Sequence, residues 1–175
     1  MVDILDKLSE ARYRADSDRV VEHLLAHPEA VPVVVRSLRN TDDVPLVQRA
    51  TMTLGNFGRR CPAGLYPYLP ALLEAATRPL HPAVQRNVIR YFSELPCEAI
   101  PEDLRGRLAD LVLYLTDDVT APTAVRVFAM QTAANLVTLY PELASELATI
   151  LRTHLPEATA GYRSRAAKIL AVLPD

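Results

Sequence analysis

Apolar residues return along the chain in two interleaved series that share nearly the same period. In the first series an apolar residue is followed by two more at steps of four, and the set recurs after 38, 41 and 37 residues. Its members are Leu46, Ala50 and Leu54, then Val84, Val88 and Phe92, then Val125, Ala129 and Ala133, and finally Tyr162, Ala166 and Leu170. The second series recurs after 38, 39 and 39 residues at Val34, Leu72, Leu111 and Ile150. Because steps of four place side chains on one face of an α-helix, the two series predict a tandem array of helix pairs.

Helical spacing covers almost the whole chain, and no run of alternating β-branched residues is bounded by turn signals. The valines of residues 31–35 come closest to a strand, but Pro32 and the flanking sequence favour a buried helix. The sequence predicts helices over residues 2–14, 17–26, 29–39, 44–58, 66–77, 82–94, 101–116, 122–139, 141–154 and 159–173.

A helix pair of this kind cannot bury its apolar face alone, so each pair is expected to pack on its neighbours. The predicted fold is all-α, a short right-handed α-α superhelix of about four helix pairs plus a leading helix. We expect residues 1–175 to form a single helical repeat domain.

The pattern within the helices resembles that of the HEAT repeat family, in which an acidic turn precedes a second helix with the pattern V-R-x-x-A-x-x-x-L. The matching residues are Val125, Arg126 and Ala129, and, with tyrosine in place of valine, Tyr162, Arg163, Ala166 and Leu170. Acidic turns are present at Asp42 and Asp43, at Asp117 and Asp118, and at Glu157. The resemblance implies a HEAT-like solenoid with hydrogen bonds from arginine to the acidic turns, interrupted at residues 79–94, where the turn has no acid.

The organisation is also similar to a group of small bacterial HEAT-like proteins that sometimes carry the label adenylosuccinate lyase. The signature loop of the true lyases, S-S-x-M-P-x-K-x-N, is not matched here. The chain has no double serine, and its two lysines are Lys7 and Lys168. The residues therefore do not support a lyase activity.

Charge and cysteine content bear on the compartment and on the class of partner. The formal net charge is -2, so the chain lacks the basic surplus that is typical of nonspecific nucleic-acid binders. No apolar run approaches the roughly 20 residues of a membrane-spanning helix, and the acidic amino terminus does not resemble a leader. We expect a cytoplasmic protein that does not contact a membrane, with Cys61 and Cys97 as free thiols.

The polar residues favour structural roles over catalysis. Carboxylate pairs stand at expected helix starts, where acids cap free N–H groups, and His27 and His81 precede prolines at turns. No catalytic residue, metal site or cofactor is predicted. In the "LGNFG" segment, Gly55 is expected to permit close helix packing and Gly58 to end the helix.

The resemblance places the second helices on the inner, concave wall, so the positions between the apolar residues would face a partner. These positions combine amides, cations and one methionine, which suits adaptable recognition of a protein or peptide. The predicted binding residues are Gln48, Met52, Asn56, Arg86, Arg90, Gln131, Asn135 and Lys168.

Three classes of function follow from this organisation. The leading hypothesis is a non-catalytic protein-binding or scaffold module that uses the concave surface, with an unknown protein or peptide as partner. The alternative is binding of nucleic acid or a phosphate ligand by inner-wall arginines, as in the HEAT-like DNA glycosylases that the architecture resembles. The absence of tryptophan and the excess of acids over bases disfavour it. The third is an enzyme, a lyase, which no residue pattern favours.

Overall fold

The computed structural model describes residues 4–11, 13–39, 42–77 and 81–174, and throughout these ranges regular structure is helical, with no strand. The all-α prediction is therefore confirmed. Residues 2, 3 and 12 of the first predicted helix lie outside the described ranges. The valines of residues 31–35 belong to a helix, as expected.

The contacts divide the chain into two compact units, Met1–Tyr91 and Phe92–Asp175. The boundary falls within one helix, between Tyr91 and Phe92. The single-domain organisation stays a prediction.

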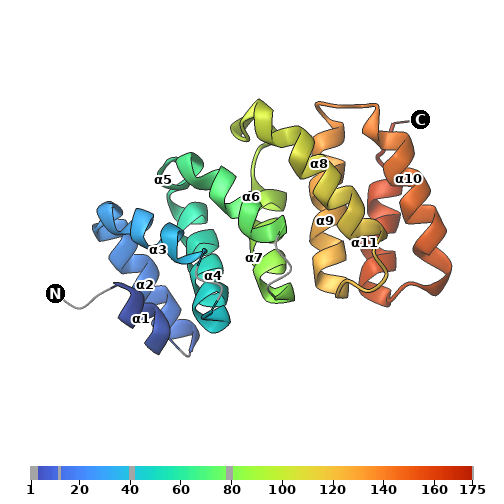
Figure 1. Cartoon of the computed structure of the whole chain (residues 1–175). Coiled ribbons are helices and arrows are strands. Elements are labelled where there is room, and N and C mark those ends of the chain that lie inside the picture. The colour runs from blue at the N-terminus through green and yellow to red at the C-terminus, as the bar shows by residue number, and fades with distance from the viewer. Residues whose placement is uncertain (1–3, 12, 40–41, 78–80, 175) are drawn as a thin grey trace. The chain divides into compact units, whose positions relative to one another are not determined.

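The first unit contains α1 (Ile4–Glu10), α2 (Arg14–Ala26), α3 (Val31–Ser37), α4 (Val44–Arg60), α5 (Pro62–Leu65), α6 (Leu69–Thr77) and most of α7 (Pro82–Glu94). Helix α4 packs against α1, α2 and α3. Figure 1 shows α2, α4 and α7 side by side. Helix α1 ends at Glu10 and α2 begins at Arg14, so the first helix ends before residue 14 and the second begins before residue 17, where the sequence placed these bounds.

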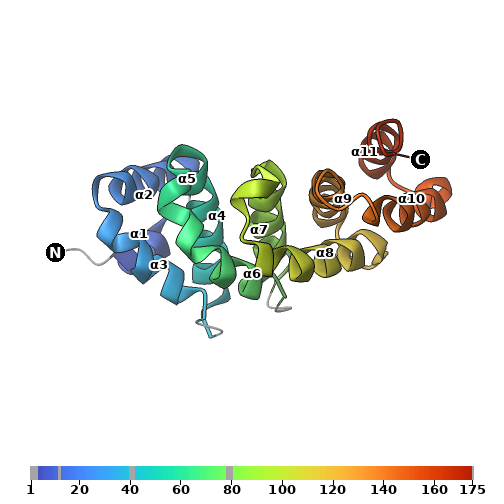
Figure 2. The same ribbon diagram turned by 90° about the horizontal axis from the view of Figure 1, so that it is seen from above.

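The second unit contains α8 (Glu102–Asp117), α9 (Thr123–Val137), α10 (Leu143–His154) and α11 (Ala160–Leu170). Helix α9 packs against α8, α10 and α11. In Figure 2, α9 and α11 lie on one side of this unit and α8 and α10 on the other. We call α4, α7, α9 and α11 the second helices, and α3, α6, α8 and α10 the first helices.

Local chemistry explains where these helices begin. Asp43 accepts a hydrogen bond from the backbone N–H of Leu46 at 3.0 Å, and Thr159 caps α11 in the same way. At the start of α7, which lacks an acid, the His81 ring accepts from the backbone N–H of Ala83 at 3.1 Å. Each cap satisfies an N–H group that the first turn of a helix leaves unpaired.

The first apolar series forms the core almost as predicted, because its members are buried with the exception of the half-buried Leu170. In the second unit, the core positions predicted by the second series are displaced by one residue from the residues that are fully buried. Leu111 and Ile150 are only half-buried, whereas the next residues, Val112 and Leu151, are fully buried. A shift of one residue rotates a helix by about 100°, which is enough to turn a side chain from the core to its edge.

The role predicted for Gly58 of α4 is also wrong. Gly58 lies inside α4 and has no positive φ, so it does not end the helix. A Cβ atom at Gly58 would lie 2.6 Å from both Leu65 Cδ2 and Tyr91 Cε2, whereas one at Gly55 would meet Tyr91 Cβ at an ordinary 3.8 Å. The close approach therefore occurs at Gly58.

Candidate binding surface on the second helices

One stripe of α4 faces solvent, and it contains the three residues predicted there. Gln48, Met52 and Asn56 are half-exposed and follow one another at steps of four, while the residues on the opposite face are buried. Arg59, one turn farther on and exposed, donates a hydrogen bond to Asn56 Oδ1. The stripe therefore offers amide, thioether and guanidinium groups in succession.

Helix α7 continues this surface beside α4. Arg86 and Arg90 are exposed one helical turn apart. The neighbouring Asn87 donates from Nδ2 to the backbone oxygen of Gln48 and to Thr51 Oγ1, both at 3.3 Å. These two hydrogen bonds set the register of α7 against α4.

In the second unit, both predicted amides are part of a hydrogen-bond chain between helices. Gln131 donates to Asn135 Oδ1 at 2.8 Å, and Asn135 donates to the backbone oxygen of Ser93 at 2.9 Å. Arg165 of α11 completes the chain by donating to Gln131 Oε1 at 2.8 Å. Sequence reasoning missed this bonding, because amides on a solvent-facing stripe do not reveal their partners.

The last predicted residue, Lys168, is exposed on α11. Arg163 and Arg165 are exposed on the same helix, which carries no carboxylate. All eight predicted binding residues are therefore half-exposed or exposed, although Gln131 and Asn135 also join helices to one another.

The arginine of the family motif, Arg126, lies at the junction of α8, α9 and α11. It is 9% exposed, and its Nε and Nη2 donate to the backbone oxygen of Thr116 at 3.1 and 2.9 Å. Its guanidinium carbon stands 4.3 Å from the centre of the buried Tyr162 ring. Arg126 therefore closes the end of α8 and packs against the next second helix.

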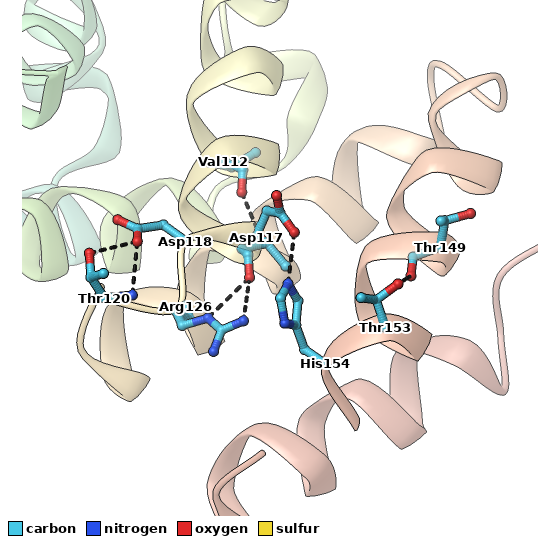
Figure 3. Close-up of polar contacts among 9 residues, drawn as sticks. Val112, Asp117, Asp118, Thr120, Arg126, Thr149, Thr153 and His154 are labelled. Carbon is cyan, nitrogen blue, oxygen red and sulfur yellow. Dashed lines mark hydrogen bonds and ion pairs between the residues drawn. The ribbon is translucent and has the colours of Figure 1, made fainter. Parts of the chain in front are cut away.

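The acidic turn beside Arg126 forms hydrogen bonds to other groups (Figure 3). Asp117 Oδ1 lies 2.7 Å from His154 Nε2, and Asp118 accepts from the hydroxyl and the backbone N–H of Thr120. The bonds from Thr120 hold the pKa of Asp118 below its ordinary value. The two hydrogen bonds from Arg126 therefore go to a backbone carbonyl at this turn, whereas the resemblance implies a carboxylate as the acceptor. The carbonyls of the last turn of α8 lack partners within the helix and need such donors.

Two histidines lie close together at the end of α2. His23 and His27 stand four residues apart at the end of α2, a spacing that sequence reasoning overlooked, with ring centroids 4.6 Å apart. His23 Nδ1 lies 3.2 Å from Lys7 Nζ, and His27 Nδ1 lies 3.2 Å from Glu29 Oε1. In the described part of the chain, no group of three or more His, Cys, Asp or Glu side chains could hold a metal ion.

Both cysteines are free thiols, as predicted. Cys97 is buried, and this burial raises the pKa of its thiol, whereas Cys61 is half-buried. Within the described ranges, none of the helices has the length and apolarity needed to cross a membrane.

Two cavities of the first unit lie away from the predicted residues. One of about 390 Å³ is lined by residues of α1 and α2, including Lys7, Glu10 and Arg19. Another of about 140 Å³ lies between α3 and α6. Neither cavity is lined by the predicted residues of α4 and α7.

The family model of the HEAT repeat domain matches residues 4–173 of the chain. Searches of the curated proteins and of the solved structures find no match.

Proposed function

Because the chain belongs to the HEAT repeat family, we propose that it is a non-catalytic binding module that holds another protein against the solvent-facing side of its second helices. Repeat architectures of this kind expose long surfaces relative to their core, and such surfaces suit contact with an extended partner.

The observation that supports the proposal is the composition of the solvent-facing stripes on α4 and α7. Gln48 and Asn56 can donate to and accept from a partner backbone. Between them, Met52 offers an adaptable apolar contact. Arg86 and Arg90 add planar donor groups that can pair with carboxylates. An interface needs an apolar centre with polar surroundings, and this set provides both.

A photo-crosslinking experiment tests the proposal. A photoreactive amino acid replaces Met52 in the first unit or Lys168 in the second, and the matched controls carry it at the exposed first-helix residues Arg36 and Arg152. After irradiation in cells, adducts are identified by mass spectrometry. We expect protein adducts from Met52 and Lys168 that are missing from the controls. Adducts that are equal at the control positions, or no protein adduct from either second-helix position, would refute the proposal.

A further inference from the structure

Charge is unevenly distributed between the two kinds of helix. The second helices carry nine cations, Arg49, Arg59, Arg60, Arg86, Arg90, Arg126, Arg163, Arg165 and Lys168, against one carboxylate, Glu94. The first helices carry four cations, Arg36, Arg105, Arg107 and Arg152, against six carboxylates, Glu74, Glu102, Asp103, Asp110, Asp117 and Glu146. A chain with a net charge of -2 therefore concentrates its positive charge on one set of helices.

Some of this positive charge is used within the protein. Arg126 is buried against Tyr162, Arg60 pairs with Glu22 of α2, and Arg49 donates to the backbone oxygen of Ser9 at 3.0 Å. On the stripes of α4 and α7, the guanidinium groups of Arg59, Arg86 and Arg90 are exposed, and those of Arg59 and Arg86 donate to the side-chain oxygens of Asn56 and Asn87.

The hydrogen bonds of Asn87 locate these groups relative to one another. Asn87 lies level with Gln48 and Thr51, and the ideal Cβ of Gly55 comes within 3.8 Å of Tyr91 Cβ, so the two helices run in the same direction. Arg86 and Arg90 are separated along α7 by about 6 Å, the rise of four helical residues. Both therefore lie level with the turns of α4 that carry Gln48 and Met52.

We propose that the surface formed by Gln48, Met52, Asn56, Arg59, Arg86 and Arg90 binds an acidic, partly apolar segment of a partner protein. This inference rests on the proposed function and specifies the chemistry of the partner. Carboxylates spaced along the segment pair with the guanidinium groups of Arg86 and Arg90, because the planar fork of arginine matches a carboxylate. An apolar side chain of the segment packs against the thioether of Met52.

The same charges favour a short acidic segment over a nucleic acid. Salt screens a surface charge within about 8 Å at physiological ionic strength, so a short segment on α4 and α7 interacts mainly with the charges of these two helices, where cations outnumber carboxylates. A duplex is a long polyanion, and its affinity grows with the number of phosphates neutralised. The helix beside α4, α2, adds the carboxylates Asp16, Asp18 and Glu22 to this part of the chain.

The test uses fluorescence anisotropy with the whole chain and a labelled peptide of about 12 residues, which spans about 40 Å when extended. The peptide contains glutamates with leucines between them, and a control peptide has glutamine in place of every glutamate. We expect the acidic peptide to bind, the control peptide to bind at least about tenfold more weakly, and added salt to weaken binding.

The variant Arg86→Glu with Arg90→Glu tests the location of the site. We expect it to lower the affinity for the acidic peptide by about tenfold or more, because it removes two charge-assisted contacts and adds repulsion. The matched control, Arg36→Glu with Arg152→Glu, makes the same change in net charge on exposed first-helix residues and is expected to retain the affinity within about twofold. Unchanged circular dichroism and melting temperature establish that both variants are folded.

Three results would overturn the inference: failure of the acidic peptide to bind, equal loss of affinity in the two double variants, or tighter binding of a short DNA duplex that depends on Arg86 and Arg90.

The crosslinking experiment distinguishes a failure of this inference from a failure of the proposed function. A protein that crosslinks at Met52 and is captured equally by the Arg86→Glu, Arg90→Glu variant would leave the binding module in place and show that its partner is not acidic.

Discussion

Replacing Gly58 by alanine tests the packing between α4, α5 and α7. A Cβ atom there would lie 2.6 Å from Leu65 Cδ2 and 2.6 and 2.7 Å from two atoms of the Tyr91 ring. Leu65 is fully buried and Tyr91 is 2% exposed, so neither side chain can move into solvent. Overpacking of this kind costs about 1 to 3 kcal/mol, and the contact distances place Gly58 near the upper end of that range.

Alanine also stabilises a helix relative to glycine by about 1 kcal/mol, which offsets part of that cost. We therefore expect Gly58→Ala to lower the free energy of unfolding by about 2 kcal/mol, or the melting temperature by about 4 to 8 °C. Gly106→Ala on α8 is the matched control, because its Cβ would meet nothing within 4 Å, and we expect it to raise stability by up to about 1 kcal/mol. Denaturant unfolding of both variants measures the difference, and a Gly58→Ala protein as stable as Gly106→Ala would refute the packing argument.

Four further substitutions test other parts of the structure. Arg126→Met removes two hydrogen bonds to a carbonyl and the contact with Tyr162, and we expect it to cost about 2 to 4 kcal/mol in denaturant unfolding; a cost below about 1 kcal/mol would contradict this role. Burial raises the pKa of Tyr91 from 10.0 to about 12. The folded state therefore holds this proton more tightly, and about 2 to 3 kcal/mol of stability, present below pH 10, is lost as pH rises toward 12. Tyr91→Phe should flatten this part of the stability profile, and an unchanged slope would show that Tyr91 is not its source. Leu54→Asp buries an unpaired charge and should cost about 4 kcal/mol or more, whereas Met52→Asp on the solvent-facing stripe should cost less than about 1 kcal/mol. Similar melting of these two variants would mean that the orientation of α4 is wrong.

The sequence predicts the helices well because each one repeats an apolar residue at steps that only a helix places on one face. Periodicity alone, however, does not fix the rotation of a helix about its axis to within one residue. Leu111 and Val112 are both apolar, as are Ile150 and Leu151, so the pattern could not show which of each pair is fully buried.

Contacts between helices were harder to predict than the helices themselves. Two glycines three residues apart look alike in sequence, and only the position of Tyr91 distinguishes the tightly packed Gly58 from Gly55. The amides of Gln131 and Asn135 are on the predicted face, but their bonds to Arg165 and Ser93 depend on the spacing of neighbouring helices. Arg126 likewise matches a motif, while its acceptor is set by the unpaired carbonyls at the end of α8.

Methionine methyl NMR is the most direct test of the claim that the solvent-facing side of the second helices is the binding surface. Met52 is half-exposed on the α4 stripe, and the fully buried Met130 of α9 provides an internal control. On titration with the acidic peptide, we expect the Met52 methyl resonance to shift in proportion to the bound fraction while that of Met130 stays in place. A peptide that binds with the Met52 resonance unmoved would contradict the account.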